Sequence, residues 1–268
     1  MVLGSAYRRR AIPGVEHVEG DAYRRTVVID GDPGVLELRP GGPLHLILFA
    51  HLPHWADLIH LVNRARRIAS LDSDLDEPLA QLSGDALLAP LITARPGLRV
   101  PGTWDPFETG VRAIIGQQVS ITGATTIIGR LVARLGTTVP GLGAMGLTHT
   151  FPSPETLAGA DLTGLGLTHA REGAITAFAR AVADGDILLD RSVGLDDLVN
   201  SITAITGLGG WTAHYVALRL GEPDAFPATD LGIRRVLAPH GPGVDERWRP
   251  WRSLATSHLW AASGAGAS

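Results

Sequence analysis

Cysteine is absent from the chain, and its absence excludes several kinds of site. None of the 268 residues is Cys, so the chain forms no disulfide, no thiolate zinc site and no cysteine-ligated iron–sulfur cluster. A chain without cysteine suits a reducing compartment. We therefore predict a cytoplasmic location.

Long hydrophobic runs and an excess of positive charge are also missing. No stretch reaches the ~18 uninterrupted apolar residues of a membrane span, and no apolar run follows the basic residues near the N-terminus. We expect no membrane contact. The formal net charge is −4 and the pI is about 6.2, unlike a protein that binds phosphate over its whole surface. Any contact with nucleic acid must be local.

A metal site is not indicated by the sequence either. His51 and His54 stand close together in HLPHW, but no third ligand follows at a suitable spacing. We predict no catalytic metal and no cofactor.

The first part of the chain carries a pattern of strands. Between Tyr23 and His51, β-rich runs alternate with turn signals such as DGDPG and PGGP, which predicts a small antiparallel sheet. Residues 54–71 have helical spacing of apolar residues, and we expect this helix to cover the sheet. Short helices broken by Gly and Pro follow. The predicted fold is α+β, with a sheet domain at 1–75 and a two-lobed all-helical domain at 76–268.

One helix in the second part has a well-specified start. In WDPFETGVRAIIGQQVS, Asp105 suits the N-cap, Pro106 the first helical position, and Glu108 the position three residues after the cap. Apolar residues that share one face follow, namely Phe107, Val111, Ile114 and Ile115.

A helix–hairpin–helix is predicted at about 196–221. DDLVNSITAI and WTAHYVALRL read as helices, and TGLGG connects them. Gly207 and Gly209 suit the positive-φ conformations of such a turn. The N–H groups of Gly209, Gly210, Trp211 and Thr212 would then stand at a helix N-terminus, where they bind phosphate without a basic side chain. An ordinary corner between two helices is the alternative.

Several motifs in one order carry a resemblance to a known family. The block DAFPATDLGIRRVL follows the hairpin, and RPGLRVPGTWDPFETGVRAIIGQQVS, FPSPETLAGADLTGLGLTHAREGAI and WRPWRSLATSHLW accompany it. Together with RRRAIPGVEHVEGDAYRRTV they resemble the helix–hairpin–helix–Gly/Pro–Asp superfamily of DNA glycosylases, and within it the bacterial 3-methyladenine DNA glycosylase II family. The resemblance covers nearly the whole chain. It implies an enzyme that flips an alkylated purine out of duplex DNA and hydrolyses its N-glycosidic bond.

The resemblance also implies a role for particular residues. Asp230 corresponds to the catalytic carboxylate, and Gln118 to the side chain that fills the gap left by the flipped base. Strand-cutting members carry a Lys at the position of Trp211, so the resemblance implies a monofunctional enzyme. We expect this enzyme to act as a monomer on duplex DNA. The aromatic residues of the base pocket are Trp211, Tyr215 and Trp260.

Simpler interpretations stay open for these residues, and for Gln118 the simpler one is a solvated or capping amide at a helix end. An Asp at the position of Asp230 commonly caps a helix, here residues 231–237, although Thr229 could cap it instead. Trp211 and Tyr215 are four apart on one helix face and can be core residues. The whole chain can also be a non-catalytic DNA-binding module, which would have no use for a carboxylate aimed at the sugar.

The chain departs from the family pattern in two places. The family hairpin usually has Pro before its first Gly, where this chain has Thr206. The N-terminal domain also begins late, without the strand that usually precedes RRRAIPGVE, which affects the sheet edge and any aromatic residue that this strand adds to the pocket.

Overall fold

A computed structural model of the chain describes residues 8–42, 45–54 and 58–264. The backbone contacts divide into two compact units, and each unit is made of separate stretches of the chain. One unit contains residues 66–110 and 187 onward, and the other contains residues up to 65 together with 111–186. The domain boundary near residue 75 stays a prediction.

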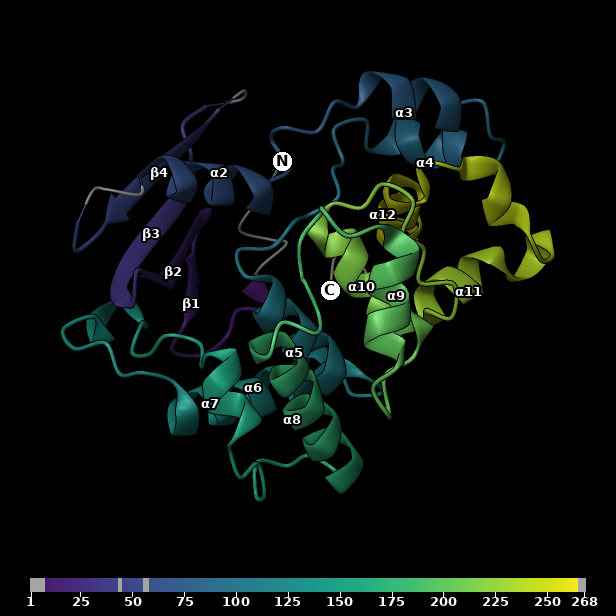
Figure 1. Ribbon diagram of the computed structural model, residues 1–268. Coiled ribbons are helices and arrows are strands. Elements are labelled where there is room, and N and C mark those ends of the chain that lie inside the picture. The colour runs from purple at the N-terminus through teal and green to yellow at the C-terminus, as the bar shows by residue number, and fades with distance from the viewer. Residues whose placement is uncertain (1–7, 43–44, 55–57, 265–268) are drawn as a thin grey trace. The chain divides into compact units, whose positions relative to one another are not determined.

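The N-terminal sheet is antiparallel, with its four strands in chain order (Figure 1). β1 is Glu16–Glu19, β2 is Ala22–Ile29, β3 is Asp32–Pro40 and β4 is Leu46–His51. Asp30 and Gly31 both have positive φ between paired Ile29 and Asp32, which is the geometry of a tight two-residue hairpin. The expected absence of a strand before Arg8 concerns residues 1–7, which lie outside the described residues.

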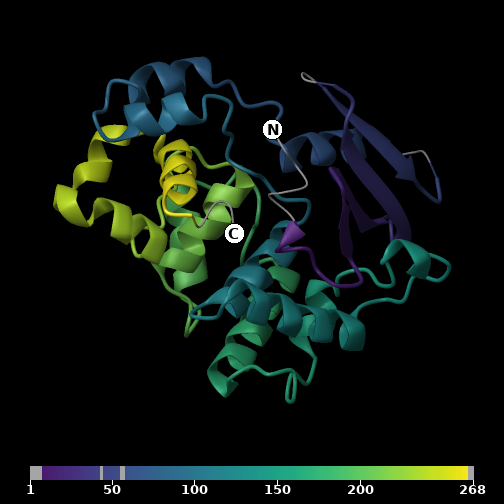
Figure 2. The same ribbon diagram turned by 180° about the vertical axis from the view of Figure 1, so that it is seen from behind.

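The expected helix lies beside the sheet in both views (Figures 1 and 2). This helix, α2, is Leu58–Ile68, shorter than the segment predicted for it, and it buries Leu61, Ala65 and Ile68. The same unit contains helices that follow later in the chain, namely α6 (Ile121–Leu135), the short η1 (Gly143–Met145), α7 (Pro154–Ala158) and α8 (His169–Ala183). The predicted α+β class is confirmed.

A buried carboxylate joins β1 to α5 (Pro106–Gly116). Glu16 accepts hydrogen bonds from the Tyr23 hydroxyl at 2.5 Å and the Ile12 N–H at 2.9 Å. It also pairs with Arg112 Nη1 at 3.2 Å and Arg25 Nη1 at 3.5 Å. Burial raises the pKa of Glu16, but the two guanidinium groups and the hydrogen bonds outweigh burial and hold that pKa below its usual value.

The second unit is helical in the residues described. It contains α3 (Asp76–Leu82), α4 (Leu88–Ala94), α9 (Leu195–Thr203), α10 (Gly210–Leu220), α11 (Leu231–Leu237), η2 (Ala238–His240), η3 (Val244–Trp248) and α12 (Arg252–Ala262). Its apolar core gathers side chains from α3, α4, α11, η3 and α12, together with Phe226 from a loop. None of the helices described is long and apolar enough to cross a membrane.

The well-marked helix start is confirmed at α5. The N–H of Glu108 donates to Asp105 Oδ1 at 3.1 Å, which satisfies one of the donors left open at a helix N-terminus. The four apolar residues expected to share one face are all buried, namely Phe107, Val111, Ile114 and Ile115.

Candidate functional site

Asp230 lies at the start of α11, where its carboxylate has four donors. Oδ1 accepts from the N–H of Gly232 at 2.9 Å and of Ile233 at 3.2 Å, so Asp230 is the N-cap of α11. Trp260 Nε1 donates to the same oxygen at 3.0 Å, and Trp211 Nε1 donates to Oδ2 at 3.0 Å. The capping interpretation is confirmed, and the suggestion that Thr229 caps the helix is wrong.

The two oxygens of this carboxylate are not equivalent. Among the described residues, Oδ1 receives three N–H donors, whereas Oδ2 receives the Trp211 indole alone. All four partners are donors, so each uses an acceptor position of the carboxylate. Oδ2 is therefore the oxygen with lone-pair capacity left for a further partner.

Two tryptophan indoles bond this carboxylate and Tyr215 packs beside both indole rings; we call these three aromatic residues and Asp230 the Asp230 cluster. Trp211 and Tyr215 stack with their centroids 5.4 Å apart, as their spacing on α10 predicts. Tyr215 and Trp260 lie 6.1 Å apart and are tilted by 53°. All three are half-buried, and Trp260 packs against the apolar core of this unit. Trp211 and Tyr215 are not among the buried core residues, so the alternative that these two belong to the core is wrong.

The hairpin between α9 and α10 agrees with the prediction except at one glycine. Gly207 has φ +90°, in the region that favours glycine. Gly209 has φ −112° and ψ 178°, so the expected positive φ at Gly209 is wrong. Gly209 is instead the N-cap of α10 in an extended conformation, which any residue can adopt.

The N-terminus of α10 is open to an anion at its first residues. No side chain caps this helix, and Gly207, Gly209 and Gly210 are exposed. The side chain of Thr212 is buried. A helix start of this kind presents backbone N–H groups that attract negative charge.

Gln118 lies in the turn between α5 and α6, which is part of the other unit. Its side chain is exposed and its φ is +55°, a conformation that is uncommon outside glycine. The neighbouring Gln117 carbonyl accepts a hydrogen bond from Arg171 on α8, and Ser120 caps α6 by accepting from the Gly123 N–H at 3.1 Å. The turn is thus fixed on both sides of Gln118.

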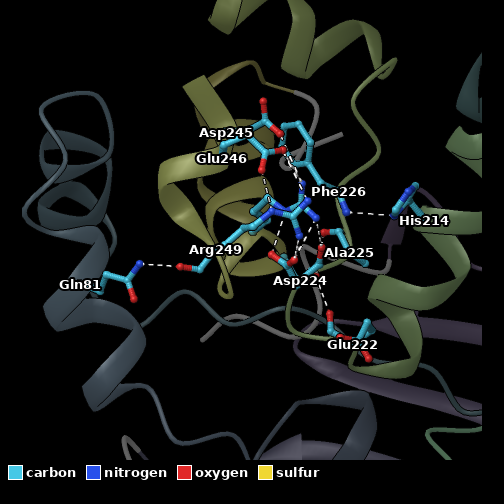
Figure 3. Close-up of polar contacts among 11 residues, drawn as sticks. Gln81, His214, Glu222, Asp224, Ala225, Phe226, Asp245, Glu246 and Arg249 are labelled. Carbon is cyan, nitrogen blue, oxygen red and sulfur yellow. Dashed lines mark hydrogen bonds and ion pairs between the residues drawn. The ribbon is translucent and has the colours of Figure 1, made fainter. Parts of the chain in front are cut away.

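The loop that precedes Asp230 is held by α12 (Figure 3). Arg252 bonds the Asp224 carboxylate with two nitrogens, Nε to Oδ1 at 2.7 Å and Nη2 to Oδ2 at 2.9 Å. On the other side, the N–H of Phe226 donates to His214 Nδ1 at 3.3 Å. Because Nδ1 accepts this bond, Nδ1 of His214 carries no proton. Burial lowers the pKa of His214, with a smaller contribution from the Arg252 charge.

Comparison with known proteins places this geometry in a family. Residues 3–105 match the family model described as the AlkA N-terminal domain, and residues 111–245 match the HhH-GPD superfamily of base excision DNA repair proteins. The chain belongs to the HhH-GPD superfamily. The resemblance identified from the sequence motifs is thereby confirmed.

Two curated relatives of this HhH-GPD chain carry names that describe DNA repair. It is 32% identical over 266 residues to DNA-3-methyladenine glycosylase 2 of Escherichia coli, covering 95% of this chain and 90% of the relative. It is 40% identical over 263 residues to the probable bifunctional transcriptional activator/DNA repair enzyme AlkA of Mycobacterium tuberculosis, covering 93% of this chain. The chain spans about half the length, 52%, of that second relative.

A solved structure agrees at the level of the fold. The 3-methyladenine DNA glycosylase from Archaeoglobus fulgidus aligns with a TM-score of 0.79 at 24% identity, over 98% of this chain and 92% of that one.

Sequence reasoning missed some residues that build this HhH-GPD site. It assigned no role to Arg252, Asp224 or His214, and it did not foresee that the Trp211 and Trp260 indoles bond to Asp230. One available signal was an Arg at the start of RSLATSHLW, a segment that has no Asp, Glu or second Arg, because an Arg inside a buried helix requires a partner.

A second missed signal is the complete absence of lysine. All 23 basic residues are Arg, so this chain has no Lys side chain to act as an amine nucleophile.

Among the described residues, no group of three or more His, Asp and Glu side chains is placed to hold a metal ion.

Proposed function

We propose that the chain is a monofunctional DNA glycosylase that removes alkylated purines, such as 3-methyladenine, from duplex DNA. The observation that carries this proposal is the Asp230 cluster, in which two tryptophan indoles bond a carboxylate with one underused oxygen and Tyr215 packs beside both indole rings. A base stacks on such rings, and a cationic base is attracted to their faces by about 0.5–2 kcal/mol.

A single carboxylate is sufficient for a cationic leaving base. When the N-glycosidic bond breaks, its electron pair goes to the base nitrogen and neutralises the positive charge of the base, so no acid is needed. The sugar becomes oxocarbenium-like, and Asp230 stabilises that charge. Water then attacks the anomeric carbon and gives its proton to Asp230 Oδ2, which forms the abasic sugar. The absence of Lys supports a reaction that stops there.

The hairpin and the Gln118 turn support the DNA-binding part of the proposal. An added Cβ at Gly209 or Gly210 would meet no atom of the described protein within 4 Å, so packing within the protein does not require glycine at either position. The close approach of a DNA phosphate to the α10 N-terminus supplies a reason for both. Exposed Gln118 is the side chain that we propose fills the gap after base flipping.

The proposal is tested by base release. Duplex DNA containing 3-methyladenine, 7-methylguanine, hypoxanthine or only normal bases is incubated with the protein, and free base and alkali-sensitive sites are measured. We expect the two cationic bases to leave well ahead of neutral hypoxanthine at neutral pH. Binding without any release would favour the non-catalytic DNA-binding module. Equal rates for hypoxanthine and 3-methyladenine would require an acid that protonates the leaving base.

Two further expectations belong to the same proposal. We infer that the protein works as a monomer, and that it acts in the cytoplasm on the chromosome. Sedimentation of the protein with and without a damaged duplex tests the first inference.

A further inference from the structure

The first two residues of α12 bind four backbone carbonyls in the first half of the loop before Asp230. Arg252 Nη2 donates to the Asp224 carbonyl at 3.0 Å, and the N–H of Ser253 donates to the Pro223 carbonyl at 2.9 Å. The Ser253 hydroxyl lies 2.6 Å from the Glu222 carbonyl and 3.0 Å from that of Ala225, and it can donate to one of them at a time. Four consecutive carbonyls, those of residues 222–225, thus face two residues of α12.

The ion pair within this contact is shielded from water. The Arg252 side chain is 8% exposed and that of Asp224 is 15% exposed. A buried ion pair is weak evidence of stabilisation, because desolvation offsets much of the attraction. Its planar two-nitrogen geometry does fix direction and distance. The pair is thus better suited to setting the position of the loop than to adding stability.

The same helix also binds Asp230 directly. Trp260 lies two turns after Arg252, about 12 Å along the helix axis, and its indole donates to Asp230 Oδ1 at 3.0 Å. One rigid element therefore fixes both the loop that leads to the carboxylate and the carboxylate itself.

We propose that Arg252 and Ser253 are positioning residues for Asp230, and this inference rests on the proposed function. They act through residues 222–226 and set where Oδ2 lies relative to the sugar of a bound nucleotide. A displacement of about 1 Å from the reacting geometry can cost ~10² in rate. Loss of the Arg252 contacts should therefore reduce the chemical step while DNA binding persists.

The test replaces Arg252 by a residue that keeps the charge but loses the planar geometry. For Arg252→Lys we expect the single-turnover rate of 3-methyladenine release to fall at least tenfold. The Kd for a duplex with a non-cleavable abasic analogue should stay within threefold of the wild-type value. Arg249→Lys is the matched control, because Arg249 bonds the same Asp224 carboxylate but its side chain is 47% exposed. It should leave both values unchanged.

A second readout does not depend on activity. In ¹H–¹⁵N correlation spectra, Trp211→Phe and Trp260→Phe identify the two indole N–H signals that report on Asp230. Both signals should move in Arg252→Lys and stay in place in Arg249→Lys. If the wild-type protein releases no base, the proposed function fails, and the indole signals still test the positioning role.

The outcome that overturns the proposal is specific. An Arg252→Lys protein that keeps the wild-type release rate and both indole signals would show that Arg252 does not position Asp230, whatever its melting temperature. If Arg252→Lys does not fold, Ser253→Ala undergoes the same measurements, since it removes a single buried hydroxyl. Unchanged rate and signals in Ser253→Ala would then overturn the proposal.

Discussion

Asp230 has two roles that make different demands on one side chain. As the N-cap of α11 it needs an acceptor oxygen at Gly232 and Ile233, and as the proposed reacting group it needs a negative charge beside the sugar. Oδ1 serves the first demand and Oδ2 the second. The same residue therefore contributes to stability and to catalysis through different atoms.

Asp230→Asn separates these two roles. Asn is as good an N-cap as Asp, so its Oδ1 can keep the bonds to α11, but its amide group then points N–H donors at the Trp211 indole N–H. We expect base release to fall by ~10² or more and DNA affinity to stay within a few-fold. The measurement is single-turnover release beside binding of the abasic analogue. Thr229→Ala, at the exposed neighbour, is the control. Wild-type turnover in Asp230→Asn would mean that Asp230 serves only as a cap.

The tryptophans of the Asp230 cluster offer both a ring face and an N–H, and two substitutions tell these contributions apart. Trp260→Phe keeps the face and loses the bond to Oδ1. A hydrogen bond to a charged group contributes about 1.5–3 kcal/mol, so the release rate of every base should fall about tenfold or more. The ratio of the 3-methyladenine release rate to the hypoxanthine release rate should stay unchanged. Trp260→Ala also removes the face, so that ratio should narrow. A ratio that is the same in both variants would show that this ring does not sense charge.

At the scale of elements, the α9–α10 hairpin has two glycines that are needed for different reasons, one for its backbone conformation and one, in our proposal, for contact with DNA. Gly207 carries the positive φ, whereas Gly209 is extended and a Cβ added there would meet no atom of the described residues within 4 Å. One glycine is therefore required by the turn and the other, in our proposal, by the DNA.

Substitution of the two glycines should give opposite patterns. Gly207→Ala places a side chain in the left-handed region and should lower stability by about 1–2 kcal/mol. Gly209→Val should lower the melting temperature only modestly, because Val is a poorer N-cap than Gly, and should weaken binding to all DNA sequences about equally. Thermal melting and binding to two unrelated duplexes measure both effects. Normal DNA binding by a folded Gly209→Val protein would rule out phosphate contact at this helix start.

At the scale of the whole molecule, stability depends on pH through a buried carboxyl group that is paired with arginine. Glu16 is one such group, because its pKa is held below the unfolded value by Arg112, Arg25 and its hydrogen bonds despite burial. A carboxyl group with a lowered pKa stabilises the folded state above its unfolded pKa of about 4.3, and this contribution is lost as the pH falls below that value.

Glu16→Gln should therefore destabilise the protein most at neutral pH. Removal of one partner from a buried pair costs about 3–5 kcal/mol. The difference in unfolding free energy from the wild type should shrink as the pH falls through 4. Urea unfolding at several pH values measures it, with the exposed Glu19→Gln as control. A difference that is constant with pH would show that the charge of Glu16 is not the source of its stabilising effect.

The sequence predicted local features well, and contacts between distant residues poorly. Short-range rules suffice for the Asp105 cap, the turn at Gly207 and the stacking of Trp211 on Tyr215. The pairs Arg252–Asp224 and Trp260–Asp230 are 28 and 30 residues apart, and no spacing rule connects them. They depend on how α11 and α12 pack in one core. The extended Gly209 was missed because glycine is compatible with many conformations, and its presence alone does not select one.

The hydrogen bonds from α12 to Asp230 and its loop have a consequence for synthesis on the ribosome. Residues 252–260 follow Asp230 in the chain, so a nascent chain that already displays Gln118 and the hairpin does not yet hold its carboxylate in place. Domains begin to fold as they leave the ribosome, and here the DNA-binding parts precede the last support of the reacting group. The unit that contains the hairpin also takes part of its apolar core from α12, so a translation product that stops before Arg252 would lack both that core and the support of Asp230, and would not repair DNA.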